Sequence, residues 1–540
     1  MTSRPDPRTR LAETLARLYP QAAPAATRRR FLQRASAALL ATASAPALLR
    51  AASPPPATPF TADPFTLGVA SGYPQPDRVV LWTRLAPEPM NDGGIAAEQL
   101  DIRWELAADE GFEHIVRQGR VTSHAELGHS VHLEPVGLEP DRVYFYRFHS
   151  ADASSPIGRT RTAPAAGARV ARLRLGLASC QHYEQGYFSG WRHLLADAPD
   201  LVVFVGDYIY EGSWGAEPVR LHRGGEARTL VDYRNRYAQY KQDPDLRAAH
   251  AALPFVLTWD DHEVDNDYAG AQSEQLDPQF LLRRAAAYQA YYEHQPLPRR
   301  MLPQGADMRV YTHLDYGDLG RILLLDDRQY RSPQACQSDN VGGSGTVRDC
   351  REMSDPDRTL LGPAQQAWLE QQLANSRARW TVLAQQTLFA TQRQSASAPH
   401  EFWNDAWDGY PHAREQVLAA LQKQRVRNPL ILGGDVHAHY ACDVHRDSAD
   451  PDSPIVASEI CTTSLASEGL SRELVEGWAR HNPHIHLARP DVRGYALIEL
   501  SRDAASADLR MVDDMRRKDS TVSSLARFRT EDGRPGWTRR

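Results

Sequence analysis

The alternation of apolar and polar positions predicts strands and helices in turn over the second part of the chain. Beyond Ala165, short apolar runs of strand length alternate with longer amphipathic stretches. The predicted strands are Leu173 to Ala178, Leu201 to Val205, Phe255 to Thr258, Arg321 to Leu325, Trp380 to Ala384 and Pro429 to Leu432. The predicted helices are Val231 to Leu253, Pro278 to Glu293, Gly362 to Ser376 and Pro411 to Gln424. This order is typical of an α/β or mixed α+β layered domain, which we place at residues 165–540.

The pattern before Ala165 is different. Runs such as Arg78 to Trp82, Asp101 to Leu106 and Val143 to Phe148 are short, rich in β-branched and aromatic residues, and broken by turn residues. They predict a small fibronectin-like β-sandwich domain at residues 65–164. Residues 53–64 are rich in proline and alanine, which predicts a flexible or extended linker.

Residues 1–52 have the pattern of an export signal. Arg28-Arg29-Arg30-Phe31-Leu32 precedes a weakly apolar segment, Ala35 to Leu49, which is made mostly of small residues. This order favours a twin-arginine signal peptide over a basic, alanine-rich tail, so we expect the twin-arginine translocation machinery as a partner and a periplasmic or secreted location. The apolar segment is too short to span a membrane, so we expect no transmembrane anchor.

The charge of the chain restricts its partners. Residues 1–52 carry nine arginines and two acidic residues, so their removal takes the net charge from −6 to about −13. A strongly acidic protein disfavours nucleic acid as a partner, and we predict no nucleic-acid-binding module. An anionic substrate would need a local positive charge, which a bound cation can provide.

Two of the predicted strands are immediately followed by residues that can bind a metal ion. Asp207 and Tyr210 come after Leu201 to Val205, while Asp261 and His262 come after Phe255 to Thr258. Ligands bind at the carboxyl ends of strands in such sheets, so these side chains are candidate metal ligands and proton carriers. The structural alternatives are core packing for Tyr210, a solvated acidic loop around Asp261 and a structural role for His262.

Two further strand ends add candidate ligands. Asp435 and His437 follow Pro429 to Leu432 and stand two positions apart, which in an extended chain directs both side chains to one face. Cys180 follows the first predicted strand, where it is either a buried apolar side chain or a thiolate ligand. The five cysteines are an odd number, and Cys336 and Cys350 flank a loop that they could close as a disulfide.

Four of these runs together closely resemble the signature of PhoD-type alkaline phosphatases: Ser179-Cys180-Gln181, Gly206 to Glu211, Trp259 to Val264 and Gly433 to His437. That family belongs to the calcineurin-like metallophosphoesterases. The resemblance therefore implies a four-layer αββα domain, with two sheets between helical layers, preceded by the small β-sandwich. It also implies that a C-terminal capping tail, from Leu509 to Trp537, packs near the mouth of the site.

The resemblance implies two kinds of metal ion. Fe³⁺ would be bound by Cys180, Asp207, Tyr210 and His437, and Ca²⁺ by Asp261 and Asp435, with Asp207 bridging the two. Oxygen-only ligation suits Ca²⁺. Gln386 is a further candidate ligand, His262 the candidate proton carrier, and Arg328 and Tyr183 are candidate substrate-binding residues.

We therefore expect an exported, metal-dependent alkaline phosphatase or phosphodiesterase that hydrolyses small phosphomonoesters or phosphodiesters with a metal-activated water. One alternative is a phospholipase D-like phosphodiesterase on the same scaffold. A second alternative, from a different class, is a non-catalytic binding protein in which the metal is only structural.

Overall fold

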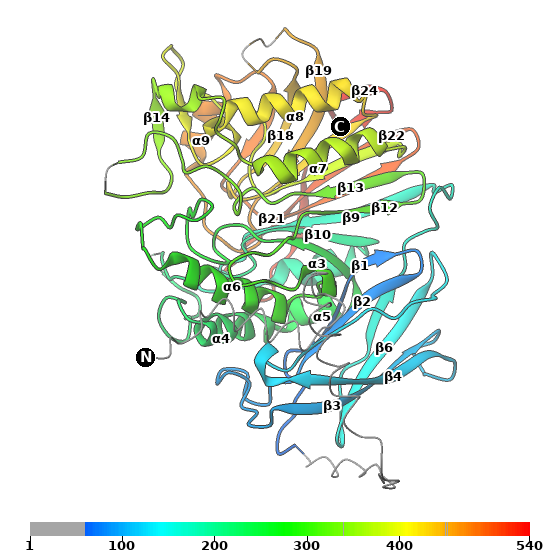
Figure 1. The fold of residues 1–540 in the computed structure, drawn as a ribbon. Helices are drawn as coiled ribbons and strands as arrows, with labels where there is room; N and C mark the ends of the chain where they lie inside the picture. The colour runs from blue at the N-terminus through cyan, green and yellow to red at the C-terminus, as the bar shows by residue number, and fades with distance from the viewer. Residues whose placement is uncertain (1–59, 216, 339, 449, 451) are drawn as a thin grey trace, which may run out of the picture.

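Two β-sheets packed face to face form the centre of the fold, and helices cover their outer faces (Figure 1). The computed structural model describes residues 60–540, apart from residues 216, 339, 449 and 451. The predicted export signal and residues 53–59 of the predicted linker lie outside the described residues. None of the helices in the described part of the chain has the length and apolar content that spanning a membrane requires.

The first sheet has ten strands in the order β24-β23-β22-β21-β9-β10-β11-β1-β2-β5. In this order the strands are Arg534–Arg539, Val522–Glu531, Ala504–Val512, Arg493–Ser501, Arg172–Ala178, Leu201–Val205, Pro254–Thr258, Val69–Gln75, Arg78–Arg84 and Ser130–Leu133. The central strands β9, β10 and β11 run parallel to one another, and β21 runs antiparallel to β9.

The second sheet has seven strands in the order β12-β13-β15-β17-β19-β18-β20. They are Thr312–Tyr316, Gly320–Leu324, Trp380–Ala384, Pro429–Gly433, Ile455–Cys461, His439–His445 and Ile485–Arg489. Strands β13, β15, β17 and β19 are parallel. A separate ribbon pairs β14 (Thr346–Arg348) with β16 (Glu401–Trp403).

The helices form the two outer layers. Four lie along the outer side of the first sheet: α3 (Ser189–Ala196), α4 (Leu230–Lys241), α5 (Pro244–Ala252) and α6 (Phe280–His294). Helices α7 (Gly362–Asn375) and α8 (Pro411–Lys423) cover the second sheet, and α9 (Arg472–Ala479) follows β19. Along β15, Val382 and Ala384 pack in the large core between the sheets, whereas Leu383 packs with α7 and α8. The predicted αββα layering is confirmed. Strands in such a fold are covered on both faces, which explains why they are apolar at successive positions.

The predicted helix from Val231 to Leu253 is wrong as a single element. It is divided into α4 and α5 at Asp243-Pro244. Proline disfavours helical geometry at the residue before it, and the Asp243 side chain accepts hydrogen bonds from the backbone N–H groups of Asp245 and Leu246. The break therefore has a local cause, an N-cap residue followed by proline at the first position of α5.

The segment 65–164 contributes strands to two sheets. Strands β3 (Gln99–Ala107), β4 (Ile115–His124), β6 (Val143–Ser150), β7 (Ala153–Ser154) and β8 (Gly158–Arg161) form a five-stranded sheet. Strands β1, β2 and β5 pack against it through a shared apolar core, but they also extend the ten-stranded sheet, since β1 pairs with β11. The β-sandwich thus shares one sheet with the rest of the molecule, a continuity that periodicity along the sequence cannot reveal.

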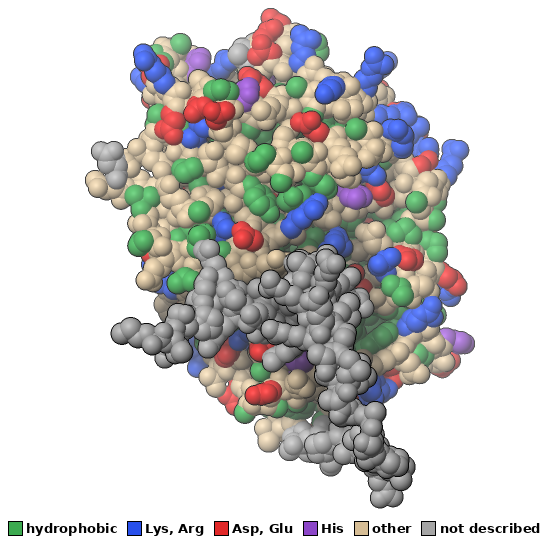
Figure 2. All heavy atoms as spheres, in the orientation of Figure 1, with side chains coloured by type: hydrophobic (Ala, Val, Ile, Leu, Met, Phe, Trp, Pro, Cys, Tyr) green, Lys and Arg blue, Asp and Glu red, His purple; other side chains and the backbone are tan. Residues whose placement is uncertain are grey.

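The C-terminal segment completes the same sheet at its other edge. Leu509 lies within β22, and Trp537 lies within β24 and donates its indole N–H to the carbonyl of Glu459. The segment from Leu509 to Trp537 therefore contains the end of β22, all of β23 and most of the edge strand β24. On the part of the face in Figure 2 that is not grey, acidic and basic side chains are intermixed.

Candidate metal centre

The loops that leave the carboxyl ends of the parallel strands meet at one edge of the two sheets. Cys180 follows β9, Asp207 follows β10, Asp261 follows β11, and Asp435 and His437 follow β17. Backbone hydrogen bonds join these loops: Cys180 N–H donates to the carbonyl of Gly206 over 3.1 Å. Predicted ligands that are far apart in sequence are thereby brought together, as expected for strand ends in parallel sheets.

The backbone at these strand ends is unusual. Cys180, Asp207, Asp435 and His437 have φ angles of 57°, 58°, 63° and 49°, in the left-handed region that residues with a Cβ seldom adopt. Each such conformation costs on the order of 1–3 kcal/mol, and residues in such conformations cluster at functional sites. Gly206 has φ 106°, and a Cβ there would lie 2.4 Å from the Cβ of Asp260, so only glycine allows these two loops to approach.

A first group of ligand atoms combines sulfur, oxygen and nitrogen. The side-chain ligand atoms of Cys180, Asp207 and His437 lie within 4.8 Å of one another. The Tyr210 hydroxyl donates to Asp207 Oδ2 over 2.9 Å and lies 3.0 Å from His437 Nε2. Ser467 donates its hydroxyl hydrogen to the Tyr210 oxygen over 2.9 Å, which fixes the phenol in place.

The electrostatics of this group favour a cation. Burial, reinforced by the charge of Asp207, raises the pKa of the Cys180 thiol and of the Tyr210 phenol well above their usual values. Both groups would need a positive charge nearby to ionise. Burial lowers the pKa of His437 to about 3, so its imidazole is neutral, the form that binds metals. Its Nδ1 faces the carbonyl of Glu468, which leaves Nε2 on the side of the phenol.

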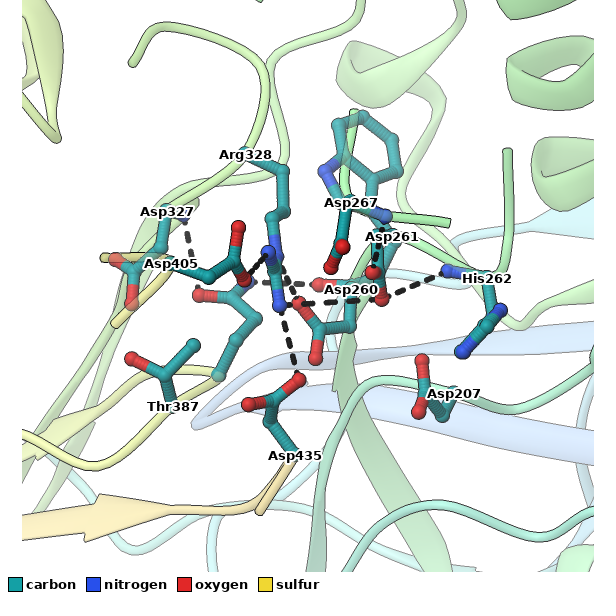
Figure 3. Close-up of polar contacts among 12 residues, drawn as sticks. Asp207, Asp260, Asp261, His262, Asp267, Asp327, Arg328, Thr387, Asp405 and Asp435 are labelled. Carbon is teal, nitrogen blue, oxygen red and sulfur yellow. Dashed lines mark hydrogen bonds and ion pairs between the residues drawn. The ribbon is translucent and has the colours of Figure 1, made fainter. Parts of the chain in front are cut away.

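Two further groups overlap the first. Asp207, Asp261 and His262 form one, and Asp260, Asp261 and Asp435 form the other, again with ligand atoms within 4.8 Å of one another in each group. Figure 3 shows these carboxylates converging. Asp207 Oδ1 and Asp260 Oδ2 are buried and have no hydrogen-bond partner in the described part of the chain. Buried carboxylate oxygens are rarely left without a partner, so this donor set fits bound metal ions.

His262 is held by a second carboxylate. Its Nδ1 lies 2.8 Å from Glu211 Oε2, and its ring centroid lies 4.3 Å from that of Tyr210. Burial disfavours the charged imidazolium, but the carboxylates of Glu211, Asp207 and Asp261 outweigh it and raise the pKa of His262 well above its usual value. These carboxylates therefore favour the protonated form of His262.

The structure does not bring Gln386 or Tyr183 to the ligand groups. The Gln386 amide donates to Thr258 Oγ1 and the carbonyl of Trp259, and its oxygen accepts from Asp327 N–H, so it joins strand ends rather than facing a metal. Tyr183 is stacked under the Arg220 guanidinium, 3.8 Å from the ring centroid, and lines a different cavity. Both predictions are corrected, because position after a strand does not determine where a side chain points.

Arg328 is placed beside the centre but not in contact with the cavity. It is fully buried, donates to Asp435 Oδ1 over 3.0 Å, and is bonded to both Asp260 and Asp405 (Figure 3). A guanidinium committed to three carboxylates is not available to clamp a substrate phosphate, so that prediction is also corrected. Arg328 instead balances part of the buried negative charge.

Several supporting residues stand next to the predicted ones but were given no specific role from the sequence. Asp260 belongs to the third ligand group and immediately precedes Asp261. Glu211 follows Tyr210 and orients His262. Glu263 accepts backbone N–H groups from Asp207, over 3.1 Å, and from Asp260, over 2.8 Å, and so joins two loops. The signal for all three was their place inside the quoted motifs.

An open cavity of about 430 Å³ gives access to the centre. Its lining includes Asp207, Asp261, His262, Asp435 and His437, so a small molecule can reach all three ligand groups. Among the described residues that line it, none comes from the segment 509–537 that was expected to cap the site.

Comparisons with known proteins agree with this geometry. The PhoD-like phosphatase family model matches residues 175–509, and the model of the N-terminal domain of PhoD-like phosphatases matches residues 50–164. The chain is 45% identical over 481 residues to alkaline phosphatase D of Bacillus subtilis (strain 168), which covers 87% of this chain and 81% of that protein. A solved structure of PhoD matches with a TM-score of 0.86 and 43% identity, over 89% of this chain and 93% of that one.

A largely buried set of carboxylate, imidazole, thiol and phenol groups at the carboxyl edge of a four-layer fold, together with the match to PhoD, fits a metal-dependent hydrolase of phosphoric esters. The matches extend over most of the chain and over both segments. The chain belongs to the PhoD-like phosphatase family. The resemblance seen in the four motifs is thus confirmed.

Proposed function

We propose that the chain is an exported alkaline phosphatase and phosphodiesterase that uses bound iron and calcium. The observation that carries this proposal is the overlap of three groups of ligand atoms, which share Asp207 and Asp261 within one accessible cavity. Overlapping groups of this kind could hold adjacent cations, which would bind a phosphoryl group and stabilise charge on its oxygens. Membership of a phosphatase family favours this function over a phospholipase D-like activity and over a non-catalytic binding protein.

We assign the two kinds of ion by the chemistry of their ligands. Thiolate and phenolate are strongly donating anions, so Cys180, Tyr210 and His437, with Asp207, would hold Fe³⁺. Asp261 and Asp435 offer only oxygen, as Ca²⁺ prefers, and Asp207 would bridge the two sites. When bound, the cations withdraw electron density from the phosphoryl group, stabilise charge on its oxygens and lower the pKa of water.

The residues of the chain supply position and a proton. Glu211 engages His262 Nδ1, so Nε2 is the nitrogen available to the substrate. The Glu211 carboxylate on Nδ1 favours the protonated imidazole, which would donate its Nε2 proton to the alkoxide that leaves phosphorus. The hydrogen bonds of Glu263 keep the loops of Asp207 and Asp260 at a fixed separation, which pre-organises the centre.

Metal analysis with a visible spectrum tests this assignment. Protein purified after export is expected to contain iron and calcium and to be coloured, because a phenolate bound to Fe³⁺ absorbs visible light. Tyr210→Phe is expected to lose the absorption, whereas Tyr311→Phe, away from the centre, should keep it. Removing calcium with a selective chelator should abolish turnover, and added calcium should restore it. A colourless, iron-free protein with full turnover would exclude the iron assignment.

We also propose export through the twin-arginine pathway, on the basis of Arg28 and Arg29 followed by Phe31 and Leu32. Replacing both Arg28 and Arg29 with lysine keeps the charge but removes the pair. Unprocessed protein is then expected to accumulate in the cytoplasm, as measured by cell fractionation, while Arg17→Lys should be exported normally. Normal export of the double variant would contradict the proposal.

A further inference from the structure

The cavity that contains the metal centre continues over a group of apolar side chains. Leu388, Ala390, Trp403, Leu470, Val475 and Trp478 line it together with the ligands. We call this group the apolar wall. A phosphoryl group bound at the centre fills only part of a cavity of about 430 Å³, so the organic part of the ester must lie along the remaining lining.

The apolar wall is assembled from separate parts of the chain. Trp403 lies in β16, Leu470 precedes α9, and Val475 and Trp478 lie within α9. Trp403 is 38% exposed and Leu470 is 51% exposed. Single exposed apolar residues are common, but large ones gathered in a concave site beside reactive groups are typical of a ligand-binding surface.

The charged residues of the lining also favour a substrate whose organic group is uncharged. Among the described residues that line the cavity, none is lysine or arginine. The negative charges of Asp405 and Asp408 are paired with arginines outside the lining. Asp405 pairs with Arg331 over 2.7 Å, and Asp408 pairs with Arg414 over 2.6 Å. Beyond the ligand groups, a second anionic substituent on the substrate would therefore meet carboxylates and no basic side chain from the lining.

We infer that this site selects phosphate esters whose organic group is apolar and uncharged, and that Trp403, Leu470 and Trp478 bind that group. The inference rests on the proposed phosphatase function, since it concerns the same cavity. It assigns the apolar wall a role in specificity: the wall removes the alkyl or aryl part of the ester from water. Esters with further negative charges are disfavoured, because the lining offers them carboxylates and no basic side chain, and esters of polyols bury less apolar surface against the wall.

A series of alkyl phosphates tests the inference with little change in leaving-group chemistry. The primary alcohols released from ethyl, propyl and butyl phosphate have similar acidity, so differences in kcat/KM report binding of the chain. Each methylene that becomes buried is expected to raise kcat/KM roughly fourfold, which makes butyl phosphate about fifteenfold better than ethyl phosphate. Propyl phosphate should also exceed glycerol 3-phosphate, which has the same number of carbons and two additional hydroxyl groups.

Variants locate the effect on the apolar wall. Trp403→Ala and Trp478→Ala are each expected to lower the ratio of butyl to ethyl phosphate kcat/KM at least about threefold, mainly through KM. Leu276→Ala, an exposed leucine outside the lining, is the matched control and should keep the wild-type ratio. Circular dichroism checks that each variant is folded.

The outcomes separate this inference from the proposed function. Hydrolysis that does not increase with chain length, or that favours glycerol 3-phosphate, overturns the inference while the phosphatase function stands. Unchanged ratios in both tryptophan variants overturn the assignment of these residues. If no alkyl phosphate and no dialkyl phosphate is hydrolysed by the metal-loaded enzyme, the proposed function itself fails.

Discussion

Asp207→Asn is expected to lower kcat/KM at least about 1,000-fold and to deplete the protein of metal. The carboxylate belongs to two of the three ligand groups, and its Oδ1 is buried without a partner among the described residues. Asparagine has almost the same shape and can still accept the hydrogen bond from Tyr210, but it lacks the negative charge that two neighbouring cations would share. Elemental analysis and steady-state kinetics on the same preparation measure both effects.

A matched control separates this loss from a general effect of removing a carboxylate. Asp508→Asn changes a partly exposed aspartate of β22 that pairs with Arg527, and it should leave metal content and turnover unchanged. The melting temperature of both variants is compared without added metal. If Asp207→Asn retained wild-type metal content and activity, Asp207 would not be the bridging ligand.

His262→Gln is expected to reduce turnover of alkyl phosphates by about 100- to 10,000-fold, the range for loss of a positioned general acid. The loss should be much smaller with p-nitrophenyl phosphate, because nitrophenolate leaves without needing a proton. This dependence on the leaving group distinguishes a proton donor from a residue that only steadies the phosphoryl oxygens, whose removal would slow both substrates alike. Rates are measured under substrate saturation with metal content determined in parallel.

Metal content decides between two roles for His262. It should stay at the wild-type level in His262→Gln, since the proposed ligand sets do not include this residue. Loss of a metal ion would instead make His262 a ligand, which its closeness to Asp207 and Asp261 also allows. His114→Gln, which changes an exposed histidine far along the N-terminal segment, is the control for the substitution itself.

The sequence predicts where the centre lies better than it predicts which side chains face it. Asp207, Asp261 and Asp435 were found because buried strands in parallel sheets end at a common edge. Arg328 and Gln386 follow strands in the same way, yet their side chains are bonded within the protein. The direction of a side chain depends on the backbone angles of its loop and on neighbours from other strands, and neither can be read from periodicity.

In the fold, features with a local sequence signal could be predicted, whereas features that depend on contacts between distant residues could not. The division between α4 and α5 at Asp243-Pro244 has a signal within four residues and could have been predicted. The pairing of β1 with β11 could not, because it joins residues more than 180 positions apart and both strands are simply apolar. Layering was predictable from alternating strands and helices, whereas the identity of neighbouring strands was not.

The strand order of the ten-stranded sheet has a consequence for how the molecule folds. Strand β9, which leads to Cys180, is bordered on one side by β21, and β11 is bordered by β1, so neighbours come from opposite ends of the described chain. Contacts between such distant segments form slowly, because the intervening chain must lose its freedom first. We therefore expect the metal centre to be among the last parts to assemble, after synthesis of the C-terminal strands. A chain truncated before β21 would leave β9 as an open sheet edge, prone to aggregation and unable to retain a metal.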